Sequence, residues 1–69
     1  MQMEQVDSGV VKRIGYDKEA RIVRVEFAKG AVYEYEKVHP EAYTALRHAD
    51  SIGSAMRNFT ATFRGKKVE

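Results

Sequence analysis

Two neighbouring segments, residues 21–27 and 31–35, alternate between apolar or aromatic side chains and charged ones. A period of two places successive side chains on opposite faces of a β-strand. The segments are separated by a short stretch that contains Gly30, so we expect them to form a β-hairpin. The positions on its apolar face are Val23, Val25, Phe27, Tyr33 and Tyr35.

The connection between these two strands determines their register. In a three-residue loop made of residues 28–30, the last position takes left-handed backbone, which Gly30 adopts without strain. A two-residue loop would mix the apolar and charged faces, because a slip of one residue turns every side chain over. We therefore expect Tyr33 and Tyr35 on the core face. The predicted pairs are Phe27–Ala31, Val25–Tyr33, Val23–Tyr35 and Arg24–Glu34.

Residues 10–16 predict an earlier strand, with Ile14 and Tyr16 on its core face. Two registers against the next strand preserve this face. One of them leaves two arginines opposite each other, which is unfavourable. We prefer the other, whose pairs are Ile14–Val25, Tyr16–Val23 and Arg13–Glu26.

After Val38 the period of the apolar positions changes from two to 3.6, which is typical of helices. Pro40 suits the first turn of a helix that continues to about Ala49. Ser51 offers an N-cap for a second helix that begins at Ile52. The apolar stripes of the two helices are Ala42, Tyr43, Leu46 and Ala49, and then Ile52, Ala55, Met56, Phe59 and Phe63.

These elements predict an α+β fold, a three-stranded antiparallel β-meander followed by two α-helices packed on one face. Residues 1–8 are polar without a period, and we expect a flexible N-terminal lead-in there. Residues 9–64 form the single predicted domain. Residues 65–69 are expected to be a basic C-terminal tail.

The composition excludes several classes of site. A chain of 69 residues builds only a small core. Cysteine is absent, which excludes disulfides, thiolate zinc sites and cysteine nucleophiles. No apolar run is long enough to span a bilayer, and the N-terminus lacks the pattern of a signal peptide. We therefore expect a cytoplasmic protein without membrane contact.

Five short motifs occur in order along the chain. They are Ile14-Gly15-Tyr16-Asp17, Val25-Glu26-Phe27, Gly30 ahead of Tyr33-Glu34-Tyr35, Val38-His39-Pro40 and Ala49-Asp50-Ser51-Ile52-Gly53. Together they resemble the KTSC domain family, which is named for its occurrence at the C-terminus of some lysyl-tRNA synthetases. The best-known mark of that family is a Tyr-x-Tyr, matched here by Tyr33 and Tyr35. The resemblance runs from about Val6 to Phe63, as in a stand-alone form.

What this resemblance implies about function is limited. The family has no established activity, and RNA binding has been suggested because of the synthetase connection. Small stand-alone members are common in bacterial and phage-related genomes. The chain departs from the family pattern at Ala55, Met56 and Arg57, where such domains carry aromatic residues and then an asparagine. A ligand site on that helix would therefore have a different form here.

The candidate catalytic residues form no pattern. His39 and His48 are nine residues apart, and no third metal ligand accompanies them at a fixed spacing. Glu34 and Glu36 share a strand face, but we expect solvated charges there, with Glu34 beside Arg24. We therefore predict no enzymatic activity, no metal and no cofactor.

Basic residues are concentrated towards the C-terminus, where residues 42–69 contain five Lys/Arg and two Asp/Glu. This excess favours RNA or another nucleic acid as partner. Arg57 and Arg64 would share one face of a continuous helix. The candidate nucleic-acid-binding residues are Arg47, Arg57, Arg64, Lys66 and Lys67. The family-motif residues Gly30, Tyr33 and Tyr35 are predicted to be structural.

A second hypothesis is a module for protein interaction or self-association as a homodimer. A three-stranded sheet has two edges that can accept a further strand. Its outer face would carry Ile22 and Val32 among charges. The sequence leaves this alternative open.

Overall fold

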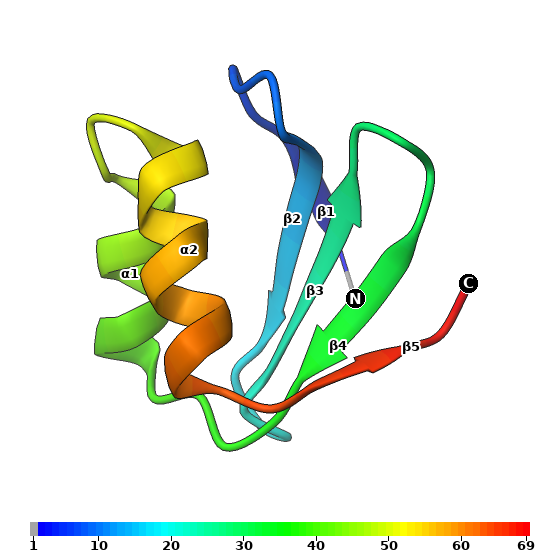
Figure 1. Ribbon diagram of the computed structural model, residues 1–69. Helices are drawn as coiled ribbons and strands as arrows, with labels where there is room; N and C mark the ends of the chain where they lie inside the picture. The colour runs from blue at the N-terminus through cyan, green and yellow to red at the C-terminus, as the bar shows by residue number, and fades with distance from the viewer. Residues whose placement is uncertain (1) are drawn as a thin grey trace.

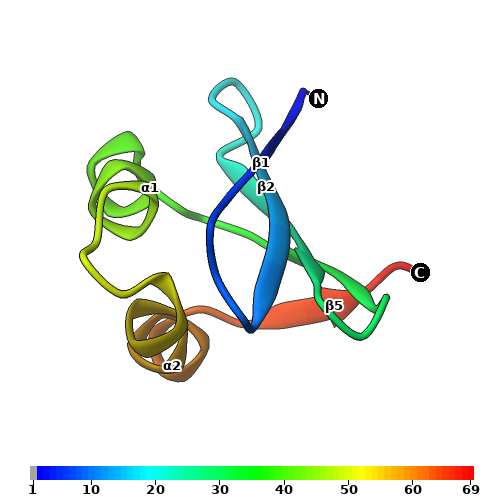
Figure 2. The same cartoon turned by 90° about the horizontal axis from the view of Figure 1, so that it is seen from above.

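The computed structural model describes residues 2–69, which form two layers (Figure 1). One layer is a five-stranded antiparallel sheet in which the strands follow each other in sequence order. The other consists of two helices on the same side of the sheet (Figure 2). The elements are β1 (Met3–Gln5), β2 (Val11–Asp17), β3 (Ile22–Phe27), β4 (Val32–Tyr35), α1 (Pro40–Arg47), α2 (Ile52–Thr62) and β5 (Gly65–Lys67).

The α+β class and the central meander are confirmed, but the prediction of three strands is wrong. Strand β1 lies within the expected lead-in and pairs with β2, and β5 lies within the expected tail and pairs with β4. Both are edge strands of three residues, and most of their side chains are exposed. They are held by backbone hydrogen bonds rather than by an apolar face, so their sequences show no alternation.

The predicted register of the central hairpin is confirmed. Val25 lies opposite Tyr33, and Val23 lies opposite Tyr35. The loop has three residues, since the Phe27 amide donates to the carbonyl oxygen of Ala31 over 2.8 Å. Its last residue, Gly30, has a φ of 103°, the left-handed backbone that glycine tolerates best.

The predicted register between β2 and β3 is confirmed as well. Ile14 lies opposite Val25, and Tyr16 lies opposite Val23. A β-bulge between Val11 and Arg13 shifts the pairing at the start of β2. A bulge bends the strand and turns nearby side chains, which lets Val11 reach the core.

The helices begin where the sequence predicts. Pro40 stands at the start of α1, and the Ser51 hydroxyl accepts a hydrogen bond from the Ser54 amide over 3.3 Å at the start of α2. Helix α2 ends at Thr62, and Phe63 has extended backbone. The prediction that one continuous helix would carry Arg57 and Arg64 on a single face is therefore wrong, because Arg64 follows the end of the helix.

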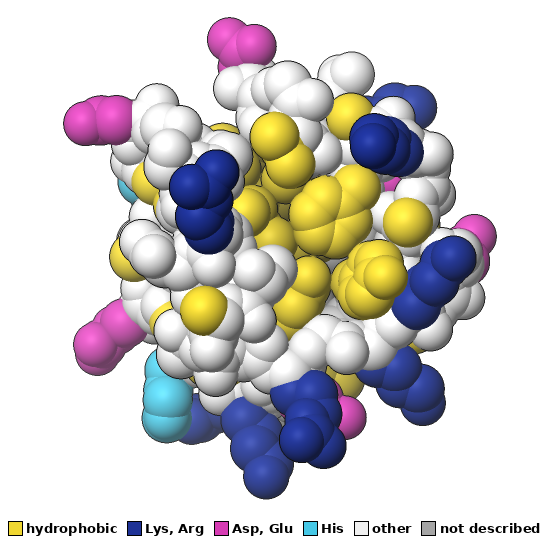
Figure 3. Space-filling model, in the orientation of Figure 1, with side chains coloured by type: hydrophobic (Ala, Val, Ile, Leu, Met, Phe, Trp, Pro, Cys, Tyr) yellow, Lys and Arg dark blue, Asp and Glu magenta, His cyan; other side chains and the backbone are white. Residues whose placement is uncertain are grey.

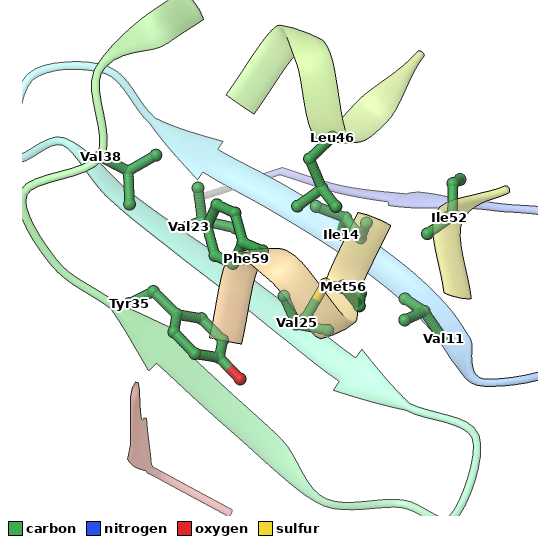
Figure 4. Close-up of a cluster of buried hydrophobic side chains, with 10 residues drawn as sticks. All are labelled: Val11, Ile14, Val23, Val25, Tyr35, Val38, Leu46, Ile52, Met56 and Phe59. Atoms are coloured by element: carbon green, nitrogen blue, oxygen red, sulfur yellow. The ribbon is translucent and has the colours of Figure 1, made fainter. Parts of the chain in front are cut away.

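The core lies between the helices and the inner face of the sheet (Figure 4). Apolar side chains of β2, β3 and β4 contact the buried stripes of both helices there. Burial of the apolar surface of these side chains supplies most of the favourable free energy of folding. The cluster consists of Val11, Ile14, Val23, Val25, Tyr35, Val38, Leu46, Ile52, Met56 and Phe59.

Candidate functional site

An apolar cavity of about 460 Å³ lies beside the hairpin loop on the inner face of the sheet. Its walls come from the β3–β4 hairpin and from Gly9 and Val10, which precede β2. Figure 3 shows hydrophobic side chains gathered in a hollow at the centre of this face, with Lys and Arg side chains around it. The lining residues are Gly9, Val10, Phe27, Ala28, Lys29, Ala31, Tyr33 and Tyr35.

A second cavity of about 300 Å³ adjoins the first, because both are lined by Val10 and Phe27. It reaches α2 at Met56, Arg57 and Thr60. Val10 is 50% exposed and contributes apolar surface to both cavities. The two cavities form one open depression, which we call the aromatic groove and define by Val10, Phe27, Tyr33, Tyr35 and Met56.

The two tyrosines of the Tyr-x-Tyr motif differ in burial. Tyr35 is only 4% exposed, and its ring meets Phe59 of α2 edge-on at a centroid distance of 5.2 Å. Tyr33 is half-buried and packs at the margin of the core. Burial, with a smaller contribution from Tyr33, raises the pKa of Tyr35 above its usual value. Both tyrosines thus lie on the core face, as predicted, and both line the groove, but Tyr35 is buried in the core whereas Tyr33 stays at its margin.

Gly65 of β5 lies directly against the Tyr35 ring. The two residues are opposite each other in the register. A Cβ at Gly65 would lie 2.9 Å from Cζ of Tyr35 and still closer to Cε2, which real Cβ atoms do not tolerate. The glycine therefore allows β5 to close over the edge of the tyrosine.

Five aromatic rings follow one another across this face, and we call them the aromatic series. Successive ring centroids are 5.7, 6.4, 5.2 and 4.6 Å apart. These distances fall in or near the range of favourable aromatic pairs. In order, the rings belong to Phe27, Tyr33, Tyr35, Phe59 and Phe63.

Three cationic side chains border the aromatic groove. Lys29 and Arg57 line its two cavities, and both are exposed. Lys67 lies opposite Tyr33 in the register, so its side chain leaves β5 on the same face as that ring. Within residues 2–69, none of the three makes a salt bridge. Their charges are therefore available to an anionic partner.

The arginines that do make salt bridges lie elsewhere. Arg13 pairs with Glu26, and Arg24 pairs with Glu34, both on the sheet face that the helices leave uncovered. The hydrogen bond from Arg13 lowers the pKa of Glu26.

The structure separates the predicted nucleic-acid-binding residues. Arg57 lines the aromatic groove, and Lys67 lies opposite Tyr33 on the same face of the sheet. Arg47 of α1 lies 3.6 Å from Glu4 of β1, in an ion pair that leaves its side chain 27% exposed. Lys66 lies opposite Glu34 on the uncovered face, and Arg64 lines a separate cavity beyond α2.

The sequence reasoning missed Val10 and Lys29 and assigned Phe27 only to the core. Phe27 is the last strand residue before the hairpin loop. This position is the feature of the sequence that could have indicated an accessible ring. A residue at the end of a strand lies at the margin of the core, and Phe27 accordingly stays partly exposed.

The histidines are separate in space and in role. The His39 ring lies 2.8 Å from Arg21, between Nδ1 and Nη1, and His48 follows the end of α1. Within residues 2–69, no three residues of the His, Cys, Asp and Glu types are grouped to hold a metal ion. No helix of this described part has the length and apolarity needed to cross a membrane.

The fold and the motifs agree with one protein family. The model of the KTSC domain matches residues 7–61, most of the chain. The chain belongs to the KTSC domain family. A KTSC domain protein from Yersinia pestis has the same fold, with a TM-score of 0.91 and 27% identity over 99% of this chain and 97% of that one.

Relatives of this KTSC domain occur in other bacteria. An uncharacterized protein of Stutzerimonas stutzeri is 42% identical over 64 residues, which cover 93% of this chain and 86% of the relative. A lysine–tRNA ligase of Nostoc punctiforme is 34% identical over 53 residues. That alignment covers 77% of this chain and 9% of the ligase.

Proposed function

We propose that this KTSC domain binds single-stranded nucleic acid, RNA above all, in the aromatic groove. One observation carries the proposal: a partly exposed aromatic surface is accompanied by cations from three separate elements that make no salt bridge within residues 2–69. These are Lys29 of the hairpin loop, Arg57 of α2 and Lys67 of β5. Proteins that hold single strands combine the same two features, a basic surface for the backbone and aromatic rings on which bases stack.

The side chains divide this work. Phe27 and Tyr33 are half-buried, and the parts of their rings that line the first cavity offer aromatic surface to an unpaired base. Lys29 and Lys67 offer point charges to phosphates, and such contacts do not depend on sequence. The proposed binding is therefore tolerant of base identity and sensitive to salt.

The comparison with the lysine–tRNA ligase adds modest support, because its name connects one relative with RNA. The proposed site differs from the basic helical face that the sequence suggested. Helix α2 contributes Arg57 to it, and the other cations come from the hairpin loop and β5. No enzymatic step is part of the proposal, since binding accounts for the features of the groove.

The alternative, protein interaction through a sheet edge, is less favoured by the edges themselves. Strand β5 is three residues long and carries Lys66 and Lys67. Short edges and edge lysines are common protections against pairing with another strand. Val32, expected on the outer face, is only 8% exposed, which reduces the apolar area available there.

Two neighbouring lysines give a matched test. Lys67→Ala removes a charge from the groove, and Lys66→Ala removes the same charge from the opposite face of the same strand. The readout is the fluorescence anisotropy of a labelled oligouridylate, titrated with each protein at several salt concentrations. We expect Lys67→Ala to weaken binding and to lower the salt slope by about 0.7. We expect Lys66→Ala to change both values much less.

Absence of binding by the unmodified domain at low salt would refute the proposal. Equal losses in the two variants would refute the groove as the site. Light scattering of the same samples reports self-association, and a mass that rises with concentration would favour the alternative.

A further inference from the structure

The aromatic series continues beyond the groove to a second basic site. Its last ring, Phe63, lies against Phe59 at 4.6 Å and lines a cavity of about 320 Å³ at the C-terminal end of α2. Lys37 and Arg64 line this cavity as well. Both are exposed, and neither makes a salt bridge within the part of the chain that the structure describes.

These two cations come from segments far apart in the sequence. Lys37 lies in the connection between β4 and α1, and Arg64 lies between α2 and β5. Lys37 has a φ of 59°, a left-handed conformation that is uncommon for a residue other than glycine. The next residue, Val38, holds this connection in place because its amide donates to the carbonyl oxygen of Arg21 over 2.9 Å. Such backbone costs free energy and persists only where surrounding structure fixes it.

The cavity also contains one opposing charge. Glu36 lines it, together with Thr62. The two cations therefore exceed the single carboxylate, and the local balance still favours an anion.

We propose that this second cavity, lined by Lys37, Phe63 and Arg64, holds a phosphate of the same strand whose base occupies the aromatic groove. This inference rests on the proposed function. It specifies the ligand as a single strand several nucleotides long rather than a mononucleotide. The aromatic series runs from one site to the other beneath the surface, since Tyr35 and Phe59 are buried, and basic residues stand at both of its ends. A short oligonucleotide reaches only the groove, whereas a longer one reaches both sites.

The test compares a two-nucleotide and an eight-nucleotide oligouridylate. The variant is Lys37→Gly combined with Arg64→Gln. Glycine suits the left-handed backbone at position 37, so the fold is retained while the charge is lost. The matched control is Lys12→Ala combined with Lys66→Ala. Lys66 lies on the uncovered face, and the charge of Lys12 acts on Glu26 of that face.

We expect the Lys37→Gly/Arg64→Gln variant to bind the two-nucleotide probe as the unmodified domain does. For the eight-nucleotide probe we expect weaker binding and a salt slope lower by about 0.7, which corresponds to the loss of one phosphate contact. The control is expected to keep most of its affinity for both probes.

Three results would overturn this inference. If the variant binds the longer probe as tightly as the unmodified domain does, the second cavity holds no phosphate. If the variant loses affinity for both probes by the same factor, the loss reflects the change in net charge and not a phosphate site in the second cavity. Each of these leaves the proposed function standing. If the unmodified domain binds neither probe, the proposed function and this inference both fail.

Discussion

Tyr35 and Tyr33 stand two residues apart on the same face of one strand, yet the structure uses them differently. Tyr35 lies beneath Phe59 of α2 and closes the core. Tyr33 lies two residue pairs nearer to the hairpin loop, where it is only half-buried beside the cavity that both tyrosines line. Strand parity sets the face of a residue, and the extent of the covering helix sets whether that face is core or surface. The same chemical group therefore serves stability in one position and is available for binding in the other.

The substitution expected to have the largest effect on stability is Tyr35→Ala. Removal of a buried aromatic ring leaves a cavity among Phe59 and its neighbours. We expect a loss of about 3–5 kcal/mol in the free energy of unfolding, measured by chemical denaturation. Tyr35→Phe is the control, because it keeps the ring. A Tyr35→Ala protein as stable as the unmodified one would contradict the assignment of Tyr35 to the core.

Gly65→Ala tests the close contact between β5 and Tyr35. An added Cβ must displace the ring or the strand, so we expect a loss of about 1–3 kcal/mol in unfolding free energy. Gly9→Ala is the matched control, since a Cβ at Gly9 meets nothing within 4 Å. Equal stability of the two variants would show that β5 does not need a glycine against the ring.

Tyr33→Ala tests whether the half-buried tyrosine contributes to binding rather than to stability. The ring is half-buried, so its loss is expected to affect stability less than Tyr35→Ala does. Loss of one base stack is expected to reduce the binding free energy for oligouridylate by about 1–3 kcal/mol, measured by anisotropy. Unchanged affinity in a folded Tyr33→Ala protein would remove this ring from the proposed site.

The raised pKa of Tyr35 predicts a pH effect at alkaline pH. The unfolded chain loses the tyrosine proton first, so the stabilisation is complete below the usual tyrosine pKa of about 10 and declines as the pH rises through the higher pKa of the folded state. Burial also raises the pKa of Tyr43, which contributes in the same direction. We expect Tyr35→Phe to reduce the decline measured by denaturation at increasing pH. If the free energy of unfolding falls as steeply at alkaline pH in Tyr35→Phe, groups other than Tyr35 cause the fall.

The uncovered face of the sheet is expected to respond least. Arg24 donates from Nε to Glu34 over 2.8 Å, but its side chain remains 36% exposed. Solvent screens such pairs, so Arg24→Ala is expected to change the free energy of unfolding by less than about 1 kcal/mol. Thermal denaturation at low and high salt measures this change. A much larger loss of unfolding free energy would show that the Arg24–Glu34 pair stabilises the fold as a buried residue does.

Much of the fold could be predicted from local patterns. Gly30 and the alternation around it determine the register of the central hairpin, and Pro40 and Ser51 mark the helix starts. The edge strands β1 and β5 could not be predicted, because backbone pairing with a neighbouring strand holds them and their side chains give no periodic signal.

The site was harder to predict than the fold. Tyr33 and Tyr35 have the same parity, and only the position of α2 above the sheet distinguishes them. Arg64 leaves the helical face because α2 ends at Thr62, after a stretch of weak helix formers. Lys67 reaches the groove only because β5 pairs with β4.

The central claim is that a nucleic acid strand contacts the open aromatic face and not the opposite face of the sheet. An NMR titration of the domain with oligouridylate measures this directly, residue by residue. We predict that the signals of Phe27, Tyr33 and Lys67 shift, while those of Arg24 and Glu34 remain unchanged. Shifts confined to the Arg24–Glu34 face, or no shifts at concentrations that saturate ordinary single-strand binders, would contradict the account.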